Sequence, residues 1–275
     1  MIWLVLLIMA IAVIAVVIYW SMNNNGSVER YEDNHQMVLF KTHVWNEDIE
    51  RFVRKIERER NCDLVILAHS DDKSLIKKIK DNELKRRVIM ITESDIRSVY
   101  EKGFVSLWLS NHWNTMWYYK KYPNYQYYWT IEYDVRIVGD SSKIWNYPGS
   151  EDFIFPHGAY QNPYWQYKND YVGGVLTDET KWYGYLQLAR YSNRFLAYLD
   201  SVFEGGENGQ DEMMMFSLWK RDNAWTGGQQ FLKQFVDDSW TVDYRDSDKN
   251  HRSIEKAEKV LKKKPKTVRI FHPVK

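Results

Sequence analysis

The sequence predicts an α/β domain with a mostly parallel central sheet flanked by helices, preceded by a single N-terminal transmembrane helix. Three observations support this fold class. Apolar strand-like runs alternate with helical periodicity over residues 37–97. A second apolar run ends in two acidic residues at 127–135. Residues 2–20 carry no charge and are long enough to cross a bilayer as a helix.

The N-terminal apolar run is predicted to be an uncleaved signal-anchor at residues 1–20. It is longer than a usual signal-peptide core, no basic segment precedes it, and no small-x-small cleavage pattern closes it. A cleaved signal peptide is the competing interpretation. The polar, turn-rich residues 21–36 then form a short stalk, and residues 37–275 form the folded domain. Arg30 is the nearest base after the apolar run, so flanking charge gives little information on orientation.

Composition excludes some classes of function and some structural features. Thirty-eight lysines and arginines balance 37 aspartates and glutamates, so no overall field draws nucleic acid to the chain. The single cysteine, Cys62, excludes an internal disulfide and is predicted to be a buried small hydrophobe. The 13 tryptophans and 20 tyrosines fit either an aromatic core or sugar-binding platforms. The basic run 256–266 is flanked by acids and predicts a solvated face.

The first half of the domain reads as alternating strands and helices. The strands are predicted at 37–41, 63–69 and 88–92, and the helices at 46–60 and 73–82, with an N-cap for a further short helix at 93–95. The run at 63–69 is continuously apolar, as expected of a central parallel strand. A β-α-β-α-β series of this kind predicts a Rossmann-like nucleotide-binding half.

The second half is less regular. An aromatic helix at 111–122 ends before Pro123, and the acidic strand 127–135 follows. Further along, we expect loops with short strands at 139–185, a helix at 185–203, a flexible loop at 204–210 and a helix at 213–220.

The acidic strand predicts a metal site. Glu132 and Asp134 are one residue apart, so on an extended strand both would point to the same face and could share a hard divalent cation. Two solvated carboxylates on a surface strand are the alternative. Aromatic and β-branched neighbours favour a buried strand, in which carboxylates require a partner or a metal.

Four segments together resemble the GT-A-fold nucleotide-diphospho-sugar glycosyltransferases, and within them a group with a WxxEYDV-like strand. These segments are residues 129–136 with Gly139-Asp140, the block 190–196, the loop 209–212 and the terminal His272-Pro273-Val274-Lys275. The resemblance implies a GT-A fold, a nucleotide-diphosphate sugar donor, a glycan, glycoprotein or glycolipid acceptor, and Mn²⁺ or Mg²⁺. Because anchored members usually face the lumen, it also implies a lumenal domain in a Golgi- or ER-like compartment.

The resemblance assigns the metal and phosphate ligands. Many members carry aspartate where this chain has Glu132, and the longer side chain suggests that only Asp134 touches the metal directly. His272 would fold back as a further ligand and Lys275 would meet a phosphate. An exposed position in a frayed tail is the alternative for His272. Nucleotide contacts are expected where the first two strands end, from Lys41 and Thr42, and from Asp71 or Asp72.

Transfer with inversion requires a base for the acceptor hydroxyl. Asp211 and Glu212 stand at the junction between a glycine-rich loop and a helix, and we favour Glu212. An acid that merely stabilises a helix N-terminus is the alternative, and retaining chemistry would need no such base. A catalytically inactive, membrane-tethered carbohydrate-binding or assembly module is the second functional hypothesis. The chain retains the acidic pair, the late histidine and the loop acids, which favours an active glycosyltransferase, for which inversion is slightly favoured over retention. A phosphohydrolase using Asp71 and Asp134 lacks a recognisable nucleophile motif.

Overall fold

The computed structural model describes residues 35–69, 74–100, 107, 110–241, 243, 245, 247–261 and 267–274. The chain divides into two units, and these residues all belong to the second, Asn34–Lys275. The predicted anchor at 1–20 and nearly all of the predicted stalk lie outside the described residues. Within the described ranges, no helix combines the length and apolarity needed to span a bilayer.

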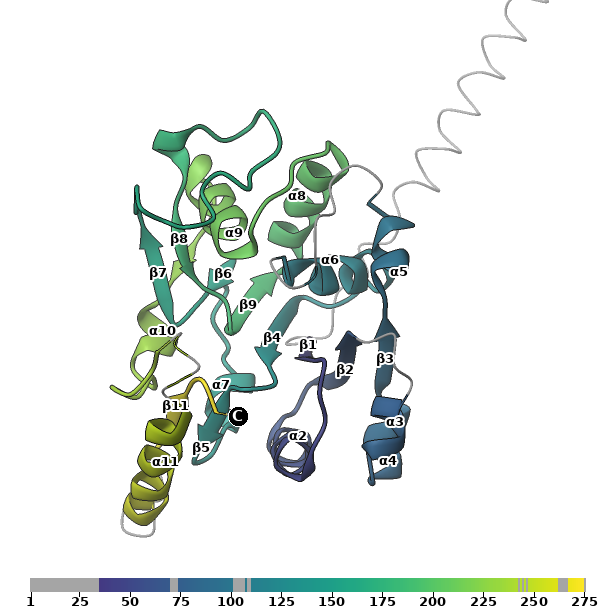
Figure 1. The fold of residues 1–275 in the computed structure, drawn as a ribbon, viewed down its shortest axis with the longest axis vertical. Coiled ribbons are helices and arrows are strands. Elements are labelled where there is room, and N and C mark those ends of the chain that lie inside the picture. Colours follow the sequence, from purple (N-terminus) through teal and green to yellow (C-terminus); the bar gives the residue numbers. More distant parts are fainter. Residues whose placement is uncertain are drawn as a thin grey trace, which may run out of the picture. The chain divides into compact units, whose positions relative to one another are not determined.

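A seven-stranded sheet forms the centre of this unit (Figure 1), in the order β10-β6-β9-β4-β1-β2-β3. Its strands are β1 (Gln36–Thr42), β2 (Asp63–His69), β3 (Val88–Ile91), β4 (Tyr127–Glu132), β6 (Phe153–Ile154), β9 (Leu188–Ser192) and β10 (Gly227–Gly228). The run from β3 through β2 and β1 to β4 is parallel. Strand β9 runs antiparallel to both of its neighbours, β4 and β6. The predicted mixed α/β fold with a mainly parallel sheet is confirmed.

Helices cover both faces of this sheet. The described helices are α2 (Glu47–Glu59), α3 (Ser74–Lys78), α4 (Asn82–Arg86), α5 (Glu93–Arg97), α6 (His112–Lys121), α7 (Ser142–Trp145), α8 (Asn193–Glu204), α9 (Asp211–Arg221), α10 (Gln230–Lys233) and α11 (Ser247–Leu261), with a 3₁₀ turn at Asp178–Thr180. Alternate residues of β1 belong to different cores, since Leu39 packs with α6, α8 and α9 while Phe40 packs with α2 and α7. The central strands are therefore buried on both faces, which explains their continuous apolar runs.

Two small antiparallel pairs lie beside the main sheet (Figure 1). Strand β5 (Arg136–Val138) pairs with β11 (Arg269–Phe271), and β7 (His157–Tyr160) pairs with β8 (Tyr183–Tyr185). The first pair carries the end of the chain back to the segment that follows β4. We call the second pair the β7–β8 ribbon.

Most early elements match the sequence prediction. Strand β2 spans the predicted residues, and α2 begins after Asn46, whose side chain accepts a hydrogen bond from the backbone of Ile49. Cys62 is buried and free, as predicted. The helix predicted at 73–82 is the shorter α3, and a further short helix, α4, begins at Asn82, where the prediction ended. The N-cap of α5 is Thr92, one residue before the predicted cap, and it forms a capping box with Asp95.

Two predictions were wrong, and one helix was not predicted. The helix predicted at 185–203 begins only at Asn193, because Leu188–Ser192 pair with β4 and β6 and form a strand buried between them. Tertiary pairing overrides the local helical pattern there. The acidic strand stops at Glu132, so Asp134 does not lie on it. Helix α11 covers the start of the basic run and was not predicted; residues 262–266 lie outside the described part.

The β7–β8 ribbon packs closely on α9, and its glycines allow this. A Cβ atom added at Gly184 would lie 2.2 Å from the ring of Phe216, and one at Gly158 would lie 2.4 Å from it. Phe216 is fully buried and has little room to shift. The ribbon therefore depends on two residues without side chains.

We predict that Gly184→Ala lowers the free energy of unfolding by about 1–3 kcal/mol, as overpacking a closed core does. Urea denaturation measures the change. Gly174→Ala is the matched control, because no atom lies within 4 Å of its added Cβ. Equal midpoints for the two variants would contradict the close packing.

Candidate metal and donor site

A cavity of about 460 Å³ opens where the central parallel strands end. Its described lining consists of Lys41, Thr42, His43, His69, Leu107, Asn111, Asn114, Glu132, Tyr133, Asp134, Tyr167, Gln187, Gln210, Asp211 and Glu212. We call it the strand-end cavity. Lys41 and Thr42 come from the end of β1, His69 from the end of β2 and Glu132 from the end of β4. This edge is where open α/β sheets bind their ligands.

A tight turn follows β4 and positions Asp134. The backbone N–H of Val135 donates to the carbonyl of Glu132 over 3.1 Å, which closes a four-residue turn. The backbone N–H of Val274 donates to the carbonyl of Asp134 over 2.8 Å. The predicted extended geometry of the acidic pair is thus replaced by a turn that brings Asp134 to the tail of the chain. His272 is buried there, so the frayed-tail alternative is wrong.

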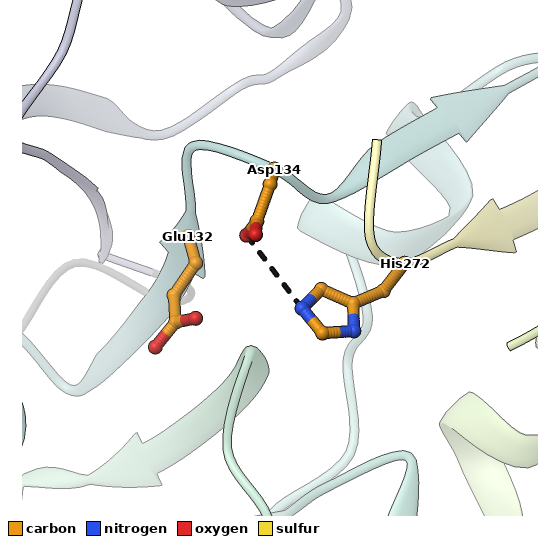
Figure 2. Close-up of side chains that lie close together, drawn as sticks. All are labelled: Glu132, Asp134 and His272. Atoms are coloured by element: carbon orange, nitrogen blue, oxygen red, sulfur yellow. Dashed lines mark ion pairs between the residues drawn. The ribbon is translucent and has the colours of Figure 1, made fainter. Parts of the chain in front are cut away.

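Glu132, Asp134 and His272 form a group that can hold a cation. One ligand atom from each lies within 4.8 Å of the other two. Figure 2 shows Asp134 and His272 pointing towards each other, with Glu132 beside them at the end of its strand. The distance between Asp134 Oδ1 and His272 Nε2 is 3.6 Å. Their carboxylate oxygens and imidazole nitrogen are donors that suit Mn²⁺ and related divalent ions.

The tautomer of His272 also fits a ligand role. Its Nδ1 lies 2.6 Å from the carbonyl oxygen of Thr241. A carbonyl only accepts, so Nδ1 carries the hydrogen and, in the neutral ring, Nε2 presents a lone pair to the side of Asp134. A backbone carbonyl that accepts from the other ring nitrogen is the common way of orienting a metal-binding histidine. The donor set therefore fits a divalent cation.

Glu132 is held by a cation and an amide. Parallel pairing of β1 with β4 places Lys41 opposite Glu132, and Lys41 Nζ lies 3.6 Å from Glu132 Oε1. Asn111 Nδ2 donates to the same oxygen over 3.0 Å, and Asn114 Nδ2 donates to Asn111 Oδ1 over 2.8 Å. Lys41 is buried, so its ammonium compensates the negative charge of the neighbouring acidic side chains. A contact between Lys41 and a phosphate stays a prediction.

Asp211 and Glu212 occupy the first turn of α9 rather than the loop before it. Burial raises the pKa of Asp211 to about 7, against the opposing effect of the Lys41 charge. Burial also raises the pKa of Glu212 well above its ordinary value, and the charge of Asp211 adds to the effect. Gln210 Nε2 lies 3.1 Å from one oxygen of each acid, and Gln187 Nε2 donates to the other oxygen of Glu212 over 3.1 Å. The two acids titrate as a pair that retains a proton near neutral pH.

The structure gathers most of the predicted site residues. Lys41, Thr42, Glu132, Asp134, Asp211 and Glu212 line one cavity, and His272 reaches its edge. Asp71, Asp72 and Lys275, which the sequence assigned to the nucleotide, lie outside the described residues.

Sequence reasoning missed the polar neutral side chains of the cavity, which are His43, His69, Asn111, Asn114, Gln187 and Gln210. His69 ends a predicted strand and Gln210 directly precedes the acidic pair, so their positions were available as signals. An isolated amide such as Asn114 carries no charge and no spacing signature that would have revealed it.

We predict that Asp211→Asn gains stability relative to the parent protein as the pH rises. In the unfolded chain the carboxyl has a pKa of about 3.9, whereas in the fold the pKa is about 7. The stabilisation from protonated Asp211 is full below the unfolded pKa and is lost as the pH rises through the folded pKa. The asparagine never ionises, so its advantage grows over this interval, by at most about 1.4 kcal/mol per pKa unit.

Urea unfolding at pH 4.5 and pH 8 measures the difference. Asp178→Asn serves as the control, because that carboxyl is exposed and its pKa is lowered by Lys181. A stability difference for Asp211→Asn that stays constant across this range would contradict the buried, proton-holding carboxyl.

No family model and no curated protein matches the sequence. Among solved structures, the chain is similar to the apo WbbM bifunctional glycosyltransferase, with 13% identity, 90% of this chain covered and a TM-score of 0.44. It spans about half of that protein, 47% of its length. It is also similar to galactosyltransferase LgtC in complex with donor and acceptor sugar analogues, with 9% identity, a TM-score of 0.42 and coverage of 86% and 87% of the two chains. For mouse xyloside xylosyltransferase 1, the identity is 10%, the TM-score 0.40 and the coverage 88% and 97%.

Proposed function

We propose that this protein is a metal-dependent glycosyltransferase of the GT-A type, which moves a sugar from a nucleotide-diphosphate donor to an acceptor hydroxyl. The observation that carries the proposal is the convergence of two functional groups on the strand-end cavity. One is the cation-binding set of Asp134, His272 and Glu132, and the other is the proton-holding pair of Asp211 and Glu212. Such a cavity has the size and polarity of a small-molecule site.

Asp134 and His272 would hold a divalent cation, Mn²⁺ or Mg²⁺, with Glu132 at its edge. When bound, this cation supplies Lewis-acid stabilisation for the negative charge of a departing nucleoside diphosphate. Glu132 is already engaged by Lys41 and Asn111, so it orients the site more than it coordinates. This division of roles between Asp134 and Glu132 agrees with the side chain of Glu132, which is longer than the aspartate that many GT-A enzymes carry there.

Two buried amide oxygens support a sugar as the transferred group. Asn114 Oδ1 and Gln187 Oε1 are buried and accept no hydrogen bond from the described residues. Both residues line the cavity. A buried acceptor without a partner costs about 1–3 kcal/mol, and sugar hydroxyls are donors that could satisfy both. The orientation of each amide is fixed by its NH₂ group, because Asn114 Nδ2 donates to Asn111 and Gln187 Nε2 donates to Glu212.

Glu212 is the proposed base in an inverting reaction. It would take the proton from the acceptor hydroxyl as the hydroxyl oxygen forms its bond to the anomeric carbon and the diphosphate leaves with the other bonding pair. Glu212 would work as the base in the form of the pair in which Asp211, the more buried acid, carries the shared proton. A raised pKa brings a carboxylate closer to the range in which a base works at neutral pH.

The first functional prediction concerns Asp134. Asp134→Asn should abolish Mn²⁺-dependent binding of nucleoside diphosphates, because it removes an anionic ligand, while the melting temperature stays nearly constant. Calorimetry with a panel of nucleoside diphosphates provides the measurement. Asp140→Asn is the control, since Asp140 is an exposed acid whose carboxylate accepts a hydrogen bond from the backbone N–H of Ser142. Unchanged affinity in Asp134→Asn would refute the metal assignment.

The second functional prediction separates the two acids of α9. Glu212→Gln should reduce sugar transfer by about a hundred- to ten-thousand-fold, the usual loss on removing a general base, and leave donor binding intact. Asp211→Asn should show a smaller kinetic loss. Steady-state transfer assays with the donor found by a hydrolysis screen test both variants.

Transfer at the parent rate in both variants would show that neither acid is the base. The mechanism would then be retaining, or the acceptor would bind elsewhere, for example at the aromatic loop 160–171. An inactive carbohydrate-binding module, the second hypothesis, predicts donor binding without transfer even in the parent protein.

A further inference from the structure

A second cavity, of about 450 Å³, lies beside the candidate metal group. It is lined by His157, Gly158, Tyr160, Tyr185, Gln229, Trp240 and Thr241. We call it the aromatic cavity. Three of its walls are rings of tyrosine or tryptophan, and the β7–β8 ribbon supplies two of them. None of the residues predicted from the sequence as catalytic, nucleotide-binding or metal-binding lines it.

The aromatic cavity adjoins the metal group through His272. The ring of Trp240 packs against the His272 ring, with centroids 5.1 Å apart. Thr241 accepts from His272 Nδ1 over 2.6 Å, and its N–H donates to the His272 carbonyl over 3.0 Å. One wall of this cavity is therefore formed by residues that contact and orient a proposed metal ligand.

The β7–β8 ribbon that lines this cavity also packs on α9, the helix of the proposed base. Glu212 and Phe216 are one turn apart on α9, and Phe216 contacts Gly158 and Gly184 of the ribbon. Burial and the neighbouring Tyr185 raise the pKa of the Tyr160 hydroxyl, and the charge of Glu212 adds a smaller effect. The ribbon that lines the aromatic cavity therefore packs on the helix that carries Glu212.

The chemistry of the lining matches one class of ligand. Tyrosine and tryptophan rings offer flat apolar surfaces whose hydroxyl and N–H edges still form hydrogen bonds. Trp240 Nε1 is buried and donates to no described residue, so it lacks an acceptor that a ligand could supply. Gln229 and His157 add polar groups at the same cavity. A pyranose ring has this combination, with an apolar C–H face and a rim of hydroxyl oxygens.

We propose that the aromatic cavity is the acceptor subsite and takes a pyranose unit of a glycan. This assignment rests on the proposed function, because only a sugar transferase needs an acceptor subsite. Trp240 Nε1 donates to a hydroxyl oxygen of the acceptor, and the rings of Tyr185 and Trp240 cover its apolar face. The acceptor hydroxyl then points towards Glu212, which receives its proton.

Saturation-transfer NMR with methyl α- and β-glucosides and galactosides tests the binding directly, without donor or turnover. Ring protons of at least one glycoside should receive saturation from the parent protein and lose most of it in Trp240→Phe, which keeps the ring but removes the N–H. Gln234→Ala is the matched control, because Gln234 lines a separate cavity of about 370 Å³. Absence of saturation transfer to all four glycosides in the parent would overturn the acceptor subsite.

Kinetics then distinguish this inference from the proposed function. With the glycoside as acceptor, Trp240→Phe and Gln229→Ala should each raise KM about tenfold, the usual effect of one hydrogen bond. Gln229→Ala should do so without changing Mn²⁺-dependent donor binding or donor hydrolysis. An unchanged KM would refute the subsite while leaving the transferase intact. Failure of the parent to bind any nucleoside diphosphate with Mn²⁺ would refute the proposed function, whereas the NMR result would still decide whether the cavity binds a pyranose.

Discussion

The accumulation of negative charge at the carboxyl ends of the central strands is the constraint on which the rest of this structure depends. Glu132, Asp134, Asp211 and Glu212 all face one cavity. Carboxylates that are close together and partly removed from water cannot all stay ionised without compensation. The charge of Glu132 is compensated by Lys41, and the charge of the α9 pair is reduced because the pair retains a proton. Asp134 stands beside an imidazole whose orientation is fixed by Thr241, and there a divalent cation would complete the compensation.

The fold supplies these charges from distant parts of the sequence. Parallel pairing of β1 and β4 sets Lys41 opposite Glu132, and the turn after β4 re-aims Asp134. Antiparallel pairing of β5 and β11 then returns the end of the chain, so that His272 lies by that turn. The α9 acids arrive on a helix fixed by buried methionines and Phe216. Each ligand or proton carrier is thus held by a strand, a turn or a helix end rather than by a long loop.

The sequence predicted those parts of the site that carry a periodic or charge signature. Strand β2 and helix α2 followed from apolar spacing, and the acidic pair stood out because it ended an apolar run. The strand Leu188–Ser192 was misread as helix, since its pairing with β4 and β6 is a long-range interaction that local spacing does not encode. The turn at Asp134 was missed because the apolar run continues through Val135, and because the bond that the Val274 N–H donates to the Asp134 carbonyl comes from the distant tail. Neutral lining residues such as Asn114 and Trp240 acquire their significance only from burial and from unfilled hydrogen bonds, which no sequence pattern records.

Pulsed electron paramagnetic resonance of Mn²⁺ bound to the protein together with a nucleoside diphosphate tests the metal site directly. We expect coupling to one histidine nitrogen, which disappears in His272→Gln, and loss of tight Mn²⁺ binding in Asp134→Asn. A spectrum without nitrogen coupling in the parent protein, or with the same coupling in His272→Gln, would contradict the assignment of this acidic strand end and the returning tail as a metal site.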